Sequence, residues 1–279
     1  MANKVDALLQ SAKQSKQEAR PMDTPQAVPG MEPAETIEQL IARCLITHET
    51  KVEPTRFLVD CWGVPFLAMG NITIVRGKRK SGKSSVLRDL IRNIFTAGDM
   101  ARPRDSKPIK VGYFDLEMSA FDTQRVYEGI PADKRKNLFG FNLTEEENQL
   151  DKVMAISDHL KLDVVIVDTL TDAVADINDP QETRNMVLAV RRWNASRNNC
   201  LIGTIHTNKS DNNSQGFWGG AVDRKCFDSL LVEMVGDYEY QQITHTDARD
   251  RAPGQLSHIK RFYCVVDEGY RQYTQEKPQ

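Results

Sequence analysis

The first 35 residues are polar and contain regularly spaced prolines: Pro21, Pro25, Pro29 and Pro33. Proline interrupts helices, and a polar segment buries too little apolar surface to offset the entropy of ordering. We therefore expect residues 1–35 to be a disordered polar tail. Its stretch from Val5 to Gln10 is the part that could fold against a partner.

The next segment, residues 36–46, has apolar residues at helical spacing: Ile37, Leu40, Ile41, Cys44 and Leu45. This spacing predicts an amphipathic helix that docks on the following domain.

From Asn71 onward, short apolar runs rich in β-branched residues alternate with amphipathic segments. The apolar runs predict strands at 72–76, 109–116, 138–143, 163–168 and 200–205. Helices are predicted at 84–97, at 119–129 with Ser119 as the N-cap, from a Thr144 and Glu147 capping box to about 160, and at 180–197. Such alternation is typical of a parallel sheet covered by helices.

After Ser229 the pattern changes to strand-like runs without intervening helices, at 229–235, 238–246 and 258–266. We expect these runs to add antiparallel strands to the sheet. The predicted fold is α/β, with a mostly parallel sheet flanked by helices and antiparallel strands at the C-terminal end. The predicted domains are the tail, 1–35, and one large domain, 36–279.

Composition narrows the functional classes. The chain has 37 Lys and Arg against 39 Asp and Glu, a formal net charge of −2, so any nucleic-acid binding must be local. Cys44, Cys61, Cys200, Cys226 and Cys264 lack metal-ligand spacing and are expected to be reduced, buried thiols. No apolar run is long enough to span a membrane, and the N-terminus has no apolar signal core, so we expect a cytoplasmic protein without membrane contact.

A phosphate-binding motif follows the strand at 72–76, with the sequence Gly77-Lys-Arg-Lys-Ser-Gly-Lys-Ser84. The glycines let the backbone curl so that its amides point at phosphates, Lys83 neutralises the β and γ phosphates, and Ser84 ligates Mg²⁺. A glycine turn with a basic surface is the alternative. The motif predicts binding of ATP and Mg²⁺ by Gly77, Lys78, Arg79, Lys80, Ser81, Gly82, Lys83, Ser84 and Ser85. The basic residues Lys78, Arg79 and Lys80 could contact phosphate, DNA or a neighbouring subunit, or be solvated.

Polar residues end three of the predicted strands. Asp168 closes the Val-Val-Ile-Val strand and should hold Mg²⁺ through water, although such an Asp can also cap a turn. Glu117 follows the strand at 109–116, within reach of a γ-phosphate and its attacking water; Asp115 competes for this role. His206 ends the strand at 200–205, where it either senses the γ-phosphate or is structural.

These motifs together resemble the RecA-type ATPases, and most of all the hexameric plasmid replicative helicases of the RepA kind. The likeness spans roughly residues 54–267 and includes Tyr113 to Met118, His206 to Lys209 and Gly219 to Arg224. It implies a RecA-like core that assembles as a ring or filament, with ATP between subunits. It also implies that Glu117 activates water, that His206 is the switch, and that residues 207–219 contact DNA.

The segment Arg249-Asp-Arg251-Ala-Pro-Gly254 resembles the element that carries the fingers of this superfamily, the basic residues that one subunit contributes to the ATP site of its neighbour. Arg251 is the expected finger, with Arg249 in place of the family's lysine. Arg224 is a weaker candidate, and an ordinary basic turn is the alternative.

The sequence therefore predicts an ATPase that forms a homo-oligomeric ring, a hexamer by the resemblance, on single-stranded DNA. We expect a helicase-type role in replication or mobilisation of a plasmid or mobile element, with a protein partner at the tail. The alternative is an ATP-dependent regulatory or signalling module that binds protein and does not move along DNA. The near-zero net charge and a loop with only Lys209 basic before Arg224 favour this alternative.

Overall fold

The computed structural model describes residues 36–173, 176, 178–208, 211–236, 240–249, 259–266 and 270–274. The chain divides into two units, Met1–Pro54 and Thr55–Gln279. In the described residues, no helix is long and apolar enough to cross a membrane.

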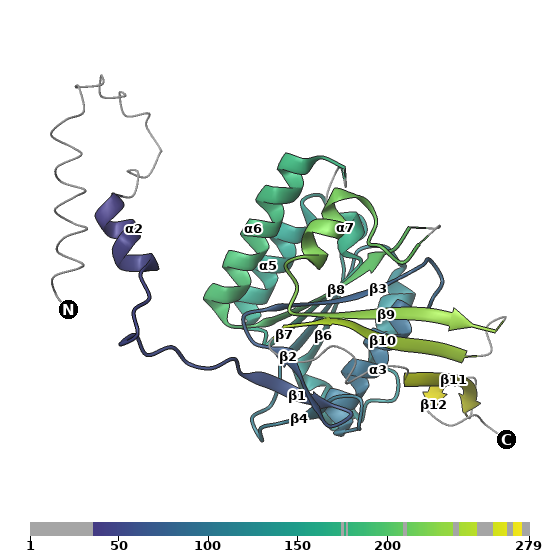
Figure 1. The fold of residues 1–279 in the computed structure, drawn as a ribbon. Helices are drawn as coiled ribbons and strands as arrows, with labels where there is room; N and C mark the ends of the chain where they lie inside the picture. The colour runs from purple at the N-terminus through teal and green to yellow at the C-terminus, as the bar shows by residue number, and fades with distance from the viewer. Residues whose placement is uncertain are drawn as a thin grey trace, which may run out of the picture. The chain divides into compact units, whose positions relative to one another are not determined.

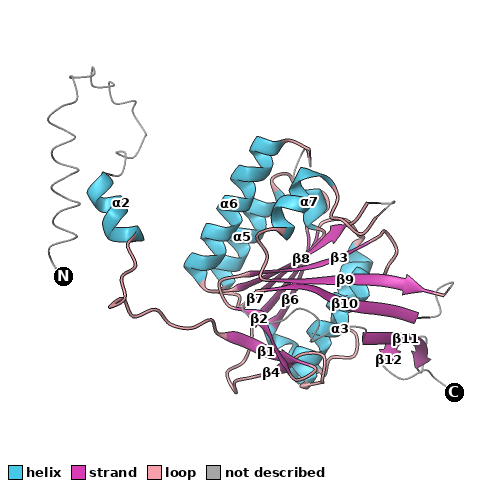
Figure 2. Ribbon diagram, in the orientation of Figure 1, coloured by secondary structure: helices cyan, strands magenta, loops and turns pink. Residues whose placement is uncertain are grey.

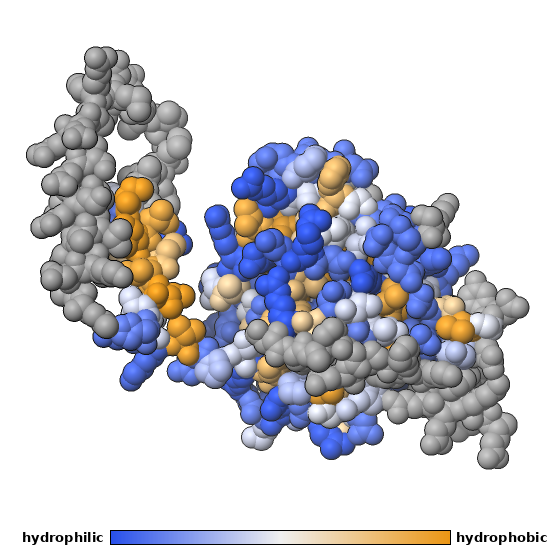
Figure 3. Space-filling view, viewed as in Figure 1, coloured by the Kyte–Doolittle hydropathy of each residue, from blue (hydrophilic) through white to orange (hydrophobic). Residues whose placement is uncertain are grey.

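The described part of the first unit contains helix α2 (Ile37–Cys44), as the apolar spacing predicts. Its capping box is complete: the Thr36 side chain accepts a hydrogen bond from the Gln39 amide, and the Gln39 side chain accepts one from the Thr36 amide. None of its residues is buried, so its apolar side chains form an exposed strip (Figure 3). The docking of this helix stays a prediction, and the expectation that Cys44 is buried is wrong.

The second unit is built on a nine-stranded sheet with the order β12-β11-β10-β9-β3-β8-β7-β5-β6 (Figure 1). The strands from β9 to β6 in this order pair in parallel: β9 (Asp228–Val235), β3 (Ile72–Gly77), β8 (Cys200–His206), β7 (Val164–Asp168), β5 (Val111–Asp115) and β6 (Leu138–Asn142). The remaining strands pair antiparallel: β10 (Tyr240–Ala248), β11 (Ile259–Val266) and β12 (Tyr270–Thr274). The predicted fold class, a RecA-like α/β fold with late antiparallel strands, is confirmed.

Helices cover both faces of this sheet (Figure 2). Helix α3 (Lys83–Thr96) lies on one face, and α5 (Gln149–Leu160), α6 (Pro180–Arg197) and α7 (Gly216–Asp223) lie on the other. Shorter helical segments are α4 (Ala120–Gln124), η1 (Arg125–Tyr127), η2 (Ala132–Asn137) and η3 (Leu170–Ala173).

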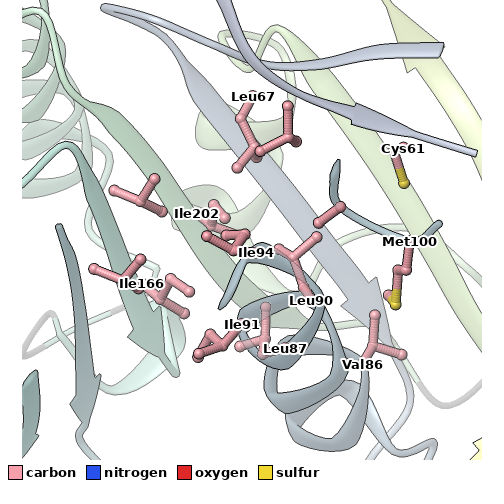
Figure 4. Close-up of a cluster of buried hydrophobic side chains, with 14 of the residues drawn as sticks. Cys61, Leu67, Val86, Leu87, Leu90, Ile91, Ile94, Met100, Ile166 and Ile202 are labelled. Carbon is pink, nitrogen blue, oxygen red and sulfur yellow. The ribbon is translucent and has the colours of Figure 1, made fainter. Parts of the chain in front are cut away.

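Two hydrophobic cores fill the space between sheet and helices. On the first face, Leu87 and Ile91 of α3 pack with Ile166 of β7 (Figure 4). On the second face, Val165 and Val167 of β7 belong to the core under α5, α6 and α7. Successive strand side chains point to opposite faces, which explains why a continuous apolar strand serves both cores.

A small second sheet, with the order β2-β1-β4, was not expected from the sequence. Its strands are β1 (Phe57–Cys61), β2 (Val64–Ala68) and β4 (Arg102–Pro103). The first two form a hairpin whose turn residues, Trp62 and Gly63, have positive φ angles of 46° and 81°. This turn type matches the twist of the flanking strands, and Gly63 is its sequence signal.

Two helix predictions need correction. Helix α5 begins at Gln149, after Asn148 in a left-handed conformation, because the Thr144 hydroxyl donates to the Asn142 side chain instead of capping a helix with Glu147. Ser119 does cap α4, but the α-helix ends at Gln124 and continues only as the 3₁₀ turn η1.

Candidate active site

The Gly77–Ser84 motif forms the connection between β3 and α3, as the sequence predicts. A Cβ atom at Gly77 would collide with the Val232 carbonyl, so only glycine allows this close approach. Gly82 is the N-cap of α3 in a left-handed conformation, with φ of 84°, and no side chain caps this helix end. The loop therefore leaves the helix N-terminus open to an anion, as phosphate-binding loops do.

Lys83 lies buried at the centre of this loop. Its Nζ donates to the carbonyls of Gly77 at 3.0 Å and Lys78 at 3.1 Å, and lies 3.0 Å from His206 Nδ1. Burial lowers the pKa of Lys83 to about 8, although the nearby carboxylates of Asp168 and Glu117 act in the opposite direction. The ammonium is therefore still protonated at neutral pH.

His206 joins the loop to the end of β8, since Gly77 and His206 are partners in the parallel register. Burial, and then the Lys83 charge, lowers the pKa of His206 to about 4, so its imidazole is neutral at pH 7. Because an ammonium can only donate, Nδ1 must accept from Lys83, and the ring proton is on Nε2. That atom lies 3.8 Å from Glu117 Oε2.

The two carboxylates after β5 have different surroundings. The Glu117 side chain is 43% exposed, and its pKa is raised by partial burial and by the charges of Asp172 and Asp168. Asp115 is buried and accepts hydrogen bonds from the Glu117 amide (3.2 Å), the Met118 amide (2.8 Å) and the Thr123 hydroxyl (3.1 Å). Asp115 therefore builds the turn from which Glu117 projects.

Asp168 ends β7 and is buried, with each carboxylate oxygen accepting one hydrogen bond. Tyr113 donates to Oδ2 at 2.9 Å, and Thr204 donates to Oδ1 at 2.6 Å. Sequence reasoning missed both donors; the signal for Thr204 is a hydroxyl within an otherwise apolar buried strand.

The residues present fit a Mg²⁺ ion bound together with a nucleotide. Ser84 lies in the first turn of α3, next to Lys83, and Asp168 is close enough to Lys83 for its negative charge to raise the pKa of the ammonium group. Within the described residues, no group of three or more His, Cys, Asp and Glu could hold a metal by itself. Hydroxyl and carboxylate oxygens combined with phosphate oxygens are the usual Mg²⁺ environment, and Ser84 and Asp168 would supply the protein's share.

The other residues of the loop take part in different ways. Lys78, Arg79 and Lys80 are exposed and, with Ser81 and Val232–Met234, line a cavity of about 330 Å³. Arg79 is near enough to affect the pKa values of Lys83, Glu117 and His206. The Ser85 hydroxyl donates to the Gly82 carbonyl at 2.6 Å.

Arg249, the described residue of the predicted finger segment, lies away from this site. Arg249 donates from its amide to the Phe227 carbonyl, and Phe227 donates to the carbonyl of Ile72, the first residue of β3. The phosphate-binding loop starts at the other end of β3, about 17 Å away at ~3.3 Å per residue. Arg249 Nη2 donates to the Arg224 carbonyl at 3.1 Å, so these two candidates are neighbours. Arg251 lies outside the described residues.

Of the segment expected to contact DNA, 207–219, the structure describes residues 207–208 and 211–219, which include the start of helix α7. Thr207 and Ser214 form an isolated bridge, and the Gln215 amide donates to the His206 carbonyl at 2.8 Å. Residues from Gly216 belong to α7, which the sequence pattern did not predict because Gly216, Gly219 and Gly220 weaken its helical character. The loop is therefore anchored directly on His206.

A family model described as an AAA domain (AAA_25) matches residues 49–212, more than half of the chain. The matched region contains the phosphate-binding loop, Glu117, Asp168 and His206, but ends before Arg224. Among curated proteins, none matches the chain significantly. On the family match and the loop geometry, this chain belongs to the AAA domain family of P-loop ATPases.

Proposed function

We propose that this P-loop ATPase is a RecA-like motor that hydrolyses ATP and assembles as a homo-oligomeric ring, a hexamer, on single-stranded DNA. The proposal includes a helicase-type role like that of the RepA-type proteins, in replication or mobilisation of a plasmid or mobile element. The observation that carries the ATP-hydrolysis part of the proposal is the approach of Lys83 to His206 (3.0 Å) and of His206 to Glu117 (3.8 Å), which links the phosphate-binding loop, β8 and the turn after β5. The ring and its place on DNA rest on the resemblance to the RepA-type helicases.

In hydrolysis, each of these side chains has a separate part. Bound Mg²⁺·ATP would supply the reacting phosphoryl group, held by Lys83 and the loop amides. Ser84 would ligate the metal, and Asp168 would hold it through water. Glu117 accepts the proton of the attacking water. Its raised pKa and half-exposed carboxylate suit a general base that water can reach.

His206 reports phosphate occupancy in this proposal. The donors of the Lys83 ammonium are directed at Gly77, Lys78 and His206, so a phosphate oxygen must replace one of these acceptors. Loss of the His206 contact would free the imidazole to move toward Glu117. Because Gln215 bonds to the His206 carbonyl, such a movement would reach the loop that follows.

The position of Arg249 supports a site shared between chains. It lies beyond the span of an arginine side chain from its own phosphate-binding loop, at the opposite end of β3. In a ring, the same edge can face the nucleotide of the next subunit and offset charge on its γ-phosphate. We propose Arg251 as this finger, with Arg249 and then Arg224 as the alternatives.

Mixing two inactive variants tests the shared site. Arg251→Ala keeps an intact phosphate-binding loop, and Lys83→Ala keeps an intact finger, so mixed oligomers contain some complete sites. Partial recovery of ATP hydrolysis supports the proposal. The matched control is Arg197→Ala, which removes an exposed arginine paired with Asp158 and should leave hydrolysis unchanged. If native mass spectrometry shows mixed oligomers without recovery, Arg251 is not the finger, and Arg249 and Arg224 are tested in turn.

DNA binding rests on the family resemblance and on the anchoring of the 207–215 loop to His206. Lys209 is the only basic residue in the sequence of this loop and is balanced by Asp211, which favours the alternative of a protein-binding regulatory ATPase. Fluorescence anisotropy of labelled single-stranded DNA, at several salt concentrations and with a non-hydrolysable ATP analogue, separates the two. Nucleotide-dependent binding that weakens with salt supports the motor; no binding at low salt supports the alternative.

A further inference from the structure

A buried glutamine on strand β10 contacts the phosphate-binding loop from the side of the antiparallel strands. The Gln241 side chain has no solvent exposure, and its Nε2 donates to the Ser81 carbonyl at 2.6 Å. The same amide group packs so closely on Gly82 that a Cβ atom there would collide with Nε2. Gln241 is separated from Ser81 by 160 residues in sequence.

Arg261 fixes the orientation of this amide group. Its Nη1 donates to Gln241 Oε1 at 2.5 Å. A guanidinium has only donors, so Gln241 must turn its oxygen toward Arg261 and its NH₂ group toward Ser81. The assignment of oxygen and nitrogen in the Gln241 amide therefore follows from its two neighbours.

Asp89 connects this arrangement back to helix α3. It forms ion pairs with Arg261 of β11 and with Arg92 of α3, and all three side chains are largely buried. The contacts run from Ser81 in the loop through Gln241 and Arg261 to Asp89, on the helix that the loop precedes. The antiparallel strands thus hold both the loop and its helix.

This arrangement determines the direction of one loop amide. In a trans peptide the carbonyl and the N–H of the same unit point in opposite directions. Gln241 holds the Ser81 carbonyl toward β10, so the N–H of Gly82 points away from β10. In a phosphate-binding loop, amides pointing inward form the concave anion site.

We propose that Gln241 is a positioning residue for nucleotide binding, which holds the Ser81–Gly82 peptide with its N–H directed at the phosphates and is itself held by Arg261. The inference rests on the nucleotide-binding role of the loop and is independent of DNA binding and of ring assembly.

The test uses Gln241→Glu, which keeps the size of the side chain and its contact with Arg261 but replaces the donor facing Ser81 by an acceptor. Gln242→Glu is the matched control, because it makes the same change one residue along, on the opposite face of β10. A fluorescent Mg²⁺·ATP analogue measures Kd, and steady-state hydrolysis gives KM and kcat.

The expected result for Gln241→Glu is a Kd and KM about tenfold higher, the effect of a lost hydrogen bond that leaves its partner unsatisfied. Because Lys83, Glu117 and Asp168 are unchanged, kcat at saturating ATP should change less than about threefold. A general loss of folded protein would lower kcat instead, and would leave the KM of the remaining active enzyme unchanged.

If Gln241→Glu does not fold by circular dichroism, Gln241→Met replaces it, since methionine has a similar length and leaves Arg261 paired with Asp89. The same tenfold rise is expected. Wild-type affinity in the folded variant, or an equal loss in Gln242→Glu, would overturn the inference. Absence of Mg²⁺·ATP binding by the wild-type chain would overturn the nucleotide-binding role, and this inference with it.

Discussion

Asp115 and Glu117 stand two residues apart after the same strand, and we expect their amide variants to fail in different ways. Glu117→Gln removes the proposed base while preserving shape, so ATP should still bind but turnover should fall at least ~100-fold, the usual range for losing a general base. Its carboxylate is 43% exposed, so the unfolding free energy should stay within about 0.5 kcal/mol of wild type.

Asp115→Asn should show the opposite pattern. The carboxylate accepts three hydrogen bonds, from two backbone amides and the Thr123 hydroxyl. In asparagine, Oδ1 still accepts from the two amides, while the NH₂ group faces the Thr123 hydroxyl, which also has the Ser119 carbonyl as an acceptor. The two amide bonds lose their charge assistance, which should cost about 2 kcal/mol of stability. For a domain of this size, that corresponds to a melting temperature lower by ~4–8 °C.

The assay measures both quantities on each variant: steady-state ATP hydrolysis with Mg²⁺ at a temperature where all proteins are folded, and urea unfolding followed by circular dichroism. Thr123→Val tests the origin of the Asp115 effect, because it removes one of the three donors and should cost less stability than Asp115→Asn. The reasoning is refuted if Glu117→Gln turns over ATP like wild type, or if Asp115→Asn is the variant that loses activity at unchanged stability.

Three further outcomes are expected. Lys83→Ala should abolish nucleotide binding and turnover while the chain stays folded, because it removes the cation at the centre of the loop; normal Mg²⁺·ATP hydrolysis would disprove the role of the loop. The pKa of His206 is about 4 in the folded chain and about 6.5 in the unfolded chain, so the unfolded chain takes up this proton first as the pH falls, which lowers the free energy of unfolding. Urea unfolding at pH 6.5 and 4.5 should therefore show wild type losing about 2 kcal/mol more than His206→Asn, in which this group cannot titrate; equal losses would contradict the assignment. Deleting residues 1–35 should leave ATP hydrolysis largely intact, since a polar, proline-rich segment adds little to a core; a large loss of activity would make the tail a subunit connector.

The sequence by itself determined the main sheet and the identity of the phosphate-binding loop. The loop motif is defined by local backbone requirements, and the strands at 163–168 and 200–205 by apolar runs that only a strand buried on both faces explains. Parallel strands end at one edge of a sheet, so Asp168, Glu117 and His206 could be expected near the loop before any contact was known. The hairpin at Trp62 and Gly63 and the start of α5 escaped prediction, because short strands and helix ends depend on competing local hydrogen bonds.

Only the tertiary structure decided which of these side chains touch. Lys83 meets His206 across 123 residues, and Asp168 takes its donors from Tyr113 and Thr204 on the two neighbouring strands. The hydrogen bond from Gln241 to Ser81 requires β10 to pair with β9 in one particular register. Arg249 lies far from the loop because β10 runs antiparallel to β9. These contacts depend on strand order, on register and on side-chain rotamers, and none of these three properties produces a periodic pattern in the sequence. Hydrophobic patterning could therefore predict the strands and helices, but not which of their residues are in contact.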